Sequence, residues 1–195
     1  MTYSFTSRMY GKLVFLFLLT GVWQCKGREA KEYKQDTLVE DKIKEKAAPL
    51  KALTLPDGTR VLMDPRTVIR PSEGFGKSNR DIQLDGEAML IVRSNVGKPF
   101  VIHTRNLVIQ VLGTRLHVDA FASSPGEQVD LLEGKLRVTK SYHSSTDNEP
   151  EILQAGEMVM INRDIDLMEK EKLSPDEQKS VEAKFPLSDT TAPRK

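Results

Sequence analysis

Residues 84–121 contain four apolar runs of strand length, and glycine, proline or asparagine separates each run from the next. Branched aliphatic residues dominate these runs, and none reaches the length of a helix without a breaker. Short runs of this kind between turn residues favour strands over a buried helix. The last run alternates between apolar and polar residues, Leu116, Val118 and Ala120 against Arg115, His117 and Asp119. We therefore expect its apolar residues to face a core and its polar residues to face solvent.

Strand-like runs of similar composition lie on both sides of this stretch. The predicted strands are residues 59–63, 67–70, 87–93, 100–104, 107–112, 114–121, 127–132, 135–140, 151–153 and 157–162. A glycine precedes five of them at intervals of 21 to 28 residues, at Gly58, Gly86, Gly113, Gly134 and Gly156. Glycine accepts positive φ at a corner without a steric penalty, and regular recurrence is typical of stacked coils. We therefore predict an all-β domain over residues 52–163, with two open alternatives, a twisted solenoid-like and a sandwich-like arrangement.

The last part of the sequence has helical rather than strand signals. Ser174 and Glu177 have the spacing of a capping box, and a proline occupies the first helical position between them. We predict a short helix over residues 175–184, followed by a disordered tail. Residues 164–195 thus form a C-terminal segment outside the predicted β domain.

The first residues of the sequence are typical of an export signal. Two basic residues, Arg8 and Lys12, precede the uncharged run at residues 13–23, and no acidic residue occurs before Glu29. A basic start followed by a short apolar run is typical of a secretory signal. The run is shorter than the roughly 20 apolar residues that a membrane-spanning helix needs. We therefore predict that residues 1–24 are a signal peptide.

Cys25 is the one cysteine of the chain and directly follows this predicted signal. The layout is similar to that of a bacterial lipoprotein signal, which implies that Cys25 becomes the lipidated first residue of the mature protein. Gln24 departs from this pattern, because a small residue usually stands there. Cleavage near Trp23 without lipidation and an uncleaved signal anchor are therefore open alternatives. A single cysteine also excludes an internal disulfide framework.

Charged residues dominate the segment that follows, at residues 25–51. Such a composition predicts a solvated tether between the lipid and the β domain. The whole chain has 29 basic and 28 acidic residues. This balance gives no reason to expect a nucleic-acid partner.

The histidines and carboxylates do not form a pattern that predicts catalysis. The histidines of the chain are His103, His117 and His143. They lack metal-binding spacing, so we expect surface positions or cross-strand packing for them. Two carboxylate pairs are candidates for an acid and a base, Asp57 with Asp64 and Asp85 with Glu87. Their predicted place at turns favours local hydrogen bonding over acid–base chemistry.

Two further groups have ordinary structural explanations. Lys135, Arg137 and Lys140 form a basic face that we expect to be solvated, and Met158 and Met160 should pack in a core. We therefore predict no catalytic residue, no metal site and no cofactor, and the sequence leaves the binding residues unassigned. Lipidation of Cys25 is the one predicted chemical modification.

Six segments, in this order and spacing, resemble the FecR domain family. They are LPDGTRVLM at 55–63, LDGEAMLIV at 84–92, KPFVIHT at 98–104, VIQVLGTRLHV at 108–118, LEGKLRV at 132–138 and LQAGEMVM at 153–160. Four positions depart from the family pattern. Met89, Leu90 and Leu116 stand where aromatic residues are usual, and His117 stands where asparagine is common. The apolar replacements are of similar character, so the resemblance still implies the same β fold.

The resemblance also implies a place in the bacterial cell envelope. FecR-type sigma regulators resemble a relay of a cytoplasmic anti-sigma helix bundle, one transmembrane helix and a periplasmic FecR domain. No residues precede the predicted signal to form such a bundle, and residues 165–195 are too few and too polar for a further C-terminal domain. We therefore expect an isolated, non-catalytic FecR-like domain that is lipid-anchored, faces the periplasm and binds an envelope protein in signalling or assembly. A glycan- or peptidoglycan-binding module is the alternative, and inner and outer membrane both stay open.

Overall fold

The structure is a computed structural model that describes residues 48–186, so the predicted signal, Cys25, most of the tether and the tail from residue 187 lie outside it. The described residues form twelve strands and one helix. The strands are β1 (Lys51–Thr54), β2 (Arg60–Met63), β3 (Val68–Pro71), β4 (Asp81–Ile91), β5 (Phe100–His103), β6 (Leu107–Val111), β7 (Arg115–Ala120), β8 (Gly126–Glu133), β9 (Lys135–Lys140), β10 (Glu151–Gln154), β11 (Glu157–Asn162) and β12 (Leu167–Lys172). The helix is α1 (Pro175–Lys184), with the predicted capping box at Ser174 and Glu177. The prediction of an all-β fold with one short helix is confirmed.

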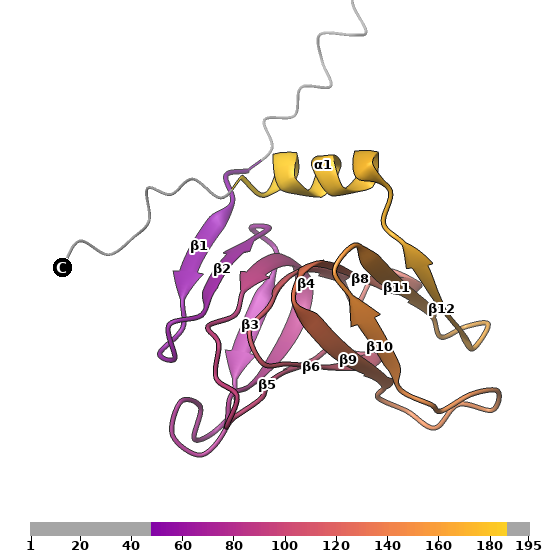
Figure 1. The fold of residues 1–195 in the computed structure, drawn as a ribbon, viewed down its shortest axis with the longest axis horizontal. Helices are drawn as coiled ribbons and strands as arrows, with labels where there is room; N and C mark the ends of the chain where they lie inside the picture. Colours follow the sequence, from indigo (N-terminus) through magenta and orange to yellow (C-terminus); the bar gives the residue numbers. More distant parts are fainter. Residues whose placement is uncertain (1–47, 187–195) are drawn as a thin grey trace, which may run out of the picture. The chain divides into compact units, whose positions relative to one another are not determined.

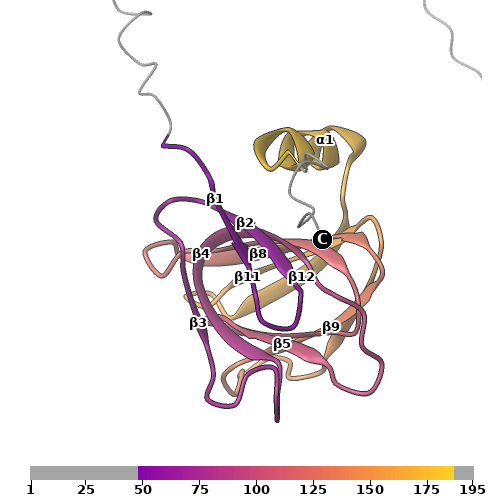
Figure 2. The same ribbon diagram turned by 90° about the vertical axis from the view of Figure 1, so that its left-hand side faces the viewer.

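The strands form two sheets that share β4 and wrap into a nearly closed barrel (Figures 1 and 2). The first sheet has the order β1-β2-β4-β7-β8-β11-β12, and the second has the order β3-β4-β5-β6-β9-β10. Neighbouring strands are antiparallel except for β4 and β5, which are parallel. Antiparallel pairing of this kind corresponds to the sandwich-like alternative rather than to stacked coils. β12 was not among the predicted strands, and it extends the first sheet beyond β11.

Gly86 lies inside β4, at the point where this strand passes from one sheet to the other. Residues 81–85 of β4 pair with β3 or β5, whereas residues 86–91 pair with β2 and β7. Gly86 has a φ of 129°, and a Cβ there would lie 2.6 Å from the Cα of Thr67. No side chain fits, so only glycine allows the bend. The prediction that Gly86 precedes a strand is therefore wrong, whereas the other four glycines lie just ahead of β2, β7, β9 and β11 as predicted.

The main core fills the space between the two sheets. It includes Leu116, Val118 and Ala120 of β7, which are buried as their alternation predicts. A second apolar cluster lies on the outer face of the first sheet and is formed by Met89, Leu132, Met158, Leu173 and Phe185. Met158 is thus buried as predicted, and Met160 is half-buried against this second cluster.

α1 lies outside the barrel, over the second cluster (Figures 1 and 2). None of its residues is fully buried, because its sequence PDEQKSVEAK has no apolar stripe. Its anchors are the flanking residues Leu173 and Phe185, both buried, and the half-buried Val181. In residues 48–186, no helix is both long and apolar enough to span a membrane.

Candidate functional site

The outer face of the first sheet presents two parallel rows of side chains, because residues paired across antiparallel strands share a face. One row, across β4, β7, β8, β11 and β12, is Met89, His117, Asp130, Met158 and Glu171. The next row, two residues along each strand, is Glu87, Asp119, Gln128, Met160 and Glu169. The first row lies against the second apolar cluster beneath α1, and the second row borders it.

A cluster of four ionisable residues joins these rows to α1, and we call it the ion cluster: Glu87, His117, Asp130 and Lys184. The Nδ1 atom of His117 lies 2.8 Å from Asp130 Oδ2, and its Nε2 atom lies 3.1 Å from Glu87 Oε1. Lys184, the last residue of α1, donates to both oxygens of Glu87 at 2.5 and 2.6 Å. The side chains of His117 and Glu87 are each 6% exposed, and that of Asp130 is fully buried.

The carboxylates decide the charge of His117. Burial alone would lower its pKa, but the hydrogen bonds to Asp130 and Glu87 outweigh burial and raise the pKa to about 9. Both ring nitrogens therefore donate at neutral pH. Burial would likewise raise the pKa of Glu87, but the hydrogen bonds from His117 and Lys184 lower it. The ion cluster is thus a buried imidazolium between two carboxylates, with a lysine of α1 on one of them.

The structure corrects two sequence predictions at this place. His117 packs across strands, which is one of its two expected positions, but it does not face solvent, because α1 and the ring of Phe185, 5.3 Å from its own ring, cover it. Glu87 was predicted at a turn, but it is a buried residue within β4. Strand alternation places both residues on the outer face correctly, but it carries no information that a helix covers that face.

The other candidate residues lie apart from the ion cluster. His103 on β5 lies 3.7 Å from Asp81, and His143 lies exposed in the loop after β9. Asp57 and Asp64 accept hydrogen bonds within their own turns, as predicted, from the backbone N–H groups of Thr59 and Arg66. Asp85 accepts from the backbone of Ala122 instead of pairing with Glu87. Among residues 48–186, no group of three or more His, Cys, Asp or Glu side chains is arranged to hold a metal ion.

The ion cluster pairs opposite charges and has no group positioned for proton transfer to a substrate. In the described part of the chain, both nitrogens of His117 contact carboxylates, and no hydroxyl or thiol lies in hydrogen-bond contact with the ring. A general base needs a free position next to the group that it deprotonates. The geometry therefore assigns the ion cluster to anchoring α1.

An open groove of about 410 Å³ lies on the outer face of the first sheet, and its lining includes the second-row residues of β7, β8, β11 and β12. Its lining residues, which define the groove hereafter, are Asp119, Ser124, Pro125, Gly126, Glu127, Gln128, Met160, Ile161, Asn162, Leu167 and Glu169. Three of them carry carboxylates and none is basic or aromatic. Glu127 is turned away and accepts from Thr104 Oγ1 and the backbone of Asn106 at 2.5 and 3.0 Å. Asp119 and Glu169 are therefore the two acidic groups of the groove.

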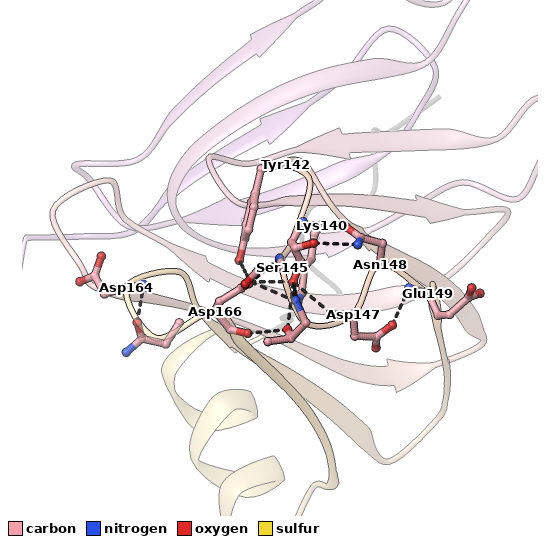
Figure 3. A network of polar contacts seen from close by, with 11 residues as sticks. Lys140, Tyr142, Ser145, Asp147, Asn148, Glu149, Asp164 and Asp166 are labelled. Carbon is pink, nitrogen blue, oxygen red and sulfur yellow. Dashed lines mark hydrogen bonds and ion pairs between the residues drawn. The ribbon is translucent and has the colours of Figure 1, made fainter.

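A polar network fixes one rim of the groove (Figure 3). Asp166, in the turn between β11 and β12, accepts hydrogen bonds from Ser144 Oγ and from the backbone and hydroxyl of Ser145, each at 2.8 Å. Tyr142 also donates to it, at 3.2 Å. These bonds, first those from the two serines, hold the pKa of Asp166 far below its usual range. The network joins the loop after β9 to this turn and so sets the position of Leu167, which is 43% exposed at the rim.

Lys140 belongs to this network, although it was predicted to be solvated together with Lys135 and Arg137. Its side chain is only 3% exposed, and its Nζ atom lies 2.8 Å from Ser144 Oγ and 3.4 Å from Asp166. A serine next to a lysine can act as a nucleophile and its base. Here Ser144 is buried, and its Oγ also accepts from two backbone N–H groups, so no substrate reaches it. The pair is structural.

Comparison with known proteins gives a family and a structural relative. Residues 41–137 match the family described as FecR protein. Two crystal structures of a candidate anti-sigma factor from Parabacteroides distasonis ATCC 8503 are similar to this chain, with TM-scores of 0.60 and 0.59 and 27% identity. They match 68% and 67% of this chain, and this chain spans 59% of the length of that protein. No curated protein matches. The matched residues include strands β1 to β8 and four of the six sequence segments that resemble the FecR domain in full, and the chain therefore carries a FecR domain.

Proposed function

We propose that this protein is a non-catalytic FecR-domain lipoprotein of the bacterial cell envelope, and that its β domain acts in signalling by binding another protein. The observation that carries the proposal is the groove on the first sheet. It combines apolar Met160 and Leu167 with the carboxylates of Asp119 and Glu169, and it lies open beside a helix that is held in place by the ion cluster. Small, partly apolar grooves with a few placed charges are typical of recognition sites. The similarity to a candidate anti-sigma factor supports a role in signalling.

Binding of a glycan is less well supported than binding of a protein. A sugar-binding surface uses exposed aromatic rings, and no aromatic residue lines the groove. The three aromatic residues in loops between the described strands have structural contacts. Phe75 packs edge-on against Phe100, with ring centroids 6.0 Å apart, the guanidinium of Arg66 lies 4.6 Å from the ring centroid of Phe121, and Tyr142 belongs to the network of Asp166.

Site-specific cross-linking in intact cells tests the proposed function. A photoreactive benzoylphenylalanine at position 167, on the rim of the groove, is expected to give a discrete cross-linked protein. The same group at position 96 is the control, because Val96 is 80% exposed but lies in the loop between β4 and β5. Equal protein products at both positions, or glycan fragments without protein at position 167, would contradict the proposal.

Lipid attachment is tested at Cys25. Replacing Cys25 with serine is expected to abolish labelling by a palmitate analogue, because the thioether to diacylglycerol needs the cysteine sulfur. The domain itself should keep its thermal unfolding transition, since residues 48–186 form their core without Cys25. More than one acyl chain gives stable membrane attachment, so the variant should also leave the membrane fraction. An unlabelled wild-type protein whose mature chain begins at another residue would refute the lipoprotein assignment.

A further inference from the structure

We propose that the groove binds an extended, basic segment of a partner protein, in which two Lys or Arg residues stand four positions apart with an apolar residue midway between them. The inference rests on the proposed function, because it assumes that the domain binds a protein. It adds the chemistry and the spacing of the segment that the groove recognises.

The negative charge of the groove indicates that the segment it binds is positively charged. Asp119 and Glu169 face the groove, and none of its lining residues is basic. In the part of the chain that the structure describes, no Lys, Arg or His lies within ion-pair distance of either carboxylate. Burial, and then the charge of nearby Glu87, raise the pKa of Asp119, and the more weakly acting charges of His117 and Lys184 do not offset them. A cation from a partner would compensate both effects, so the groove favours a basic ligand.

The pairing of the strands sets the spacing of the two charges. Asp119 on β7 and Glu169 on β12 belong to one row, with β8 and β11 between them. Three steps between neighbouring strands separate them, which corresponds to roughly 14 Å. An extended segment places its residues i, i+2 and i+4 on one side, and residues i and i+4 are roughly 13 Å apart. A basic residue at each of these two positions therefore reaches one carboxylate each.

The floor of the groove sets the middle residue. Met160 is half-buried in the same row, beside Gln128 and between the two carboxylates. Leu167 adds exposed apolar surface at the rim. An apolar side chain at position i+2 would cover both, and methionine adapts to different apolar shapes. A helical ligand is a poorer match, because its residues i and i+4 are only roughly 6 Å apart.

Fluorescence anisotropy with labelled peptides and the purified full-length protein tests the inference. The peptide Gly-Lys-Ser-Leu-Ser-Lys-Gly is expected to bind, and the same peptide with Glu in place of Lys is expected not to bind. A third peptide with adjacent lysines, Gly-Lys-Lys-Leu-Ser-Ser-Gly, keeps the charge and loses the spacing, and it should bind more weakly. Binding of the first peptide should weaken at high salt, because exposed charge pairs are screened.

Variants of the groove locate the binding. The double variant Asp119→Asn/Glu169→Gln should weaken binding of the first peptide about tenfold. Leu167→Asn should weaken it through the apolar contact. Glu73→Gln is the matched control, because Glu73 is an exposed carboxylate in the loop between β3 and β4, outside the groove. Equal affinity of the double variant and the wild type, with both folded, would overturn the inference.

Two further measurements separate failure of the inference from failure of the proposed function. If position 167 captures a protein in cells but the groove variants bind the basic peptide like the wild type, the inference fails and the proposed function stands. If the photoreactive group at position 167 captures no protein, both the proposed function and the inference fail. Analytical ultracentrifugation of the protein alone measures whether it dimerises, which tests whether a second copy of the chain occupies the groove. A dimer that the double variant dissociates would also overturn the inference.

Discussion

Replacing Asp130 with asparagine is expected to lower the free energy of unfolding by about 3 kcal/mol. Asp130 is fully buried, and its carboxylate accepts from His117 and from Gln128 Nε2, both at 2.8 Å. Asparagine keeps the size of the side chain but removes the charge that faces the buried imidazolium. Loss of one partner of a buried ion pair costs more than loss of a surface pair, because the other charge stays buried without full compensation. Removing one partner of a buried ion pair costs roughly 3 to 5 kcal/mol. Glu87 still pairs with His117, so we expect a loss at the lower end of this range. Urea denaturation followed by circular dichroism measures it.

A double-mutant cycle shows whether this loss comes from the pair with His117. His117→Gln removes the imidazolium, and it should make the additional change Asp130→Asn cost much less than in the wild type. Asp164→Asn is the matched control, because Asp164 lies exposed in the turn before β12, and a change of less than about 0.5 kcal/mol is expected there. Additive costs of the Asp130 and His117 substitutions would show that the two residues do not stabilise each other.

Most strands can be predicted from the sequence because a turn residue stands next to each of them. β9 and β11 match their predicted ranges residue for residue, and the other predicted strands are close to their observed bounds except β4, which begins six residues before its predicted start. α1 can be predicted because its capping box and proline are local signals. Local signals are also why the error at Gly86 occurs. A glycine that starts a strand and a glycine that bends a long strand have the same sequence context, and only the contact with Thr67 distinguishes them.

β12 escapes prediction because of its composition. Its sequence, LMEKEK, is mostly charged and its residues are largely exposed, as expected for an edge strand whose outer side is kept from pairing with other chains. Lys170 of β12 reaches the opposite edge of the barrel and lies 3.2 Å from Glu151 of β10. A charged edge strand and a charged loop have similar sequences, so only pairing with β11 identifies it.

The candidate site depends on contacts between residues far apart in the sequence. Glu87, His117 and Asp130 are aligned by the pairing of three strands, and Lys184 joins them only after α1 has folded back over the sheet. α1 has no apolar stripe, so its sequence does not indicate which face it covers. Its position depends on the pairs of Lys184 with Glu87 and of Glu182 with Arg115, and on the buried Leu173 and Phe185, and none of these residues belongs to a recognisable motif.

The stability of the domain is expected to fall by about 3 kcal/mol as the pH rises from 6.5 to about 9. Folding raises the pKa of His117 from 6.5 to about 9, so the folded protein holds a proton that the unfolded chain releases in this range. The resulting stabilisation is fully present below pH 6.5, where both states are protonated, and is lost as the pH passes through the folded value. The lowered pKa of Glu87 affects stability at acidic pH. Its contribution to the free energy of unfolding is lost as the pH falls below 4.5 and through the pKa of the folded state. Stability should therefore be highest between these limits.

Two histidine variants assign this pH dependence to a single residue. In His117→Gln, the free energy of unfolding should be lower at neutral pH and nearly constant from about pH 6.5 to 9, because the shifted proton is gone. In His103→Gln, it should follow the wild type, because His103 is 42% exposed and 3.7 Å from its partner Asp81. Urea titrations at about pH 6, 7.5 and 9 give the three free energies for each protein.

Because α1 covers the ion cluster, hydrogen exchange of the α1 amides should also become faster, relative to the rest of the domain, as His117 loses its proton and Lys184 alone pairs with Glu87. A wild-type stability that stays level across this range, or a His117→Gln variant that loses stability as steeply as the wild type, would show that the buried imidazole is neutral and that its charge does not help to hold α1.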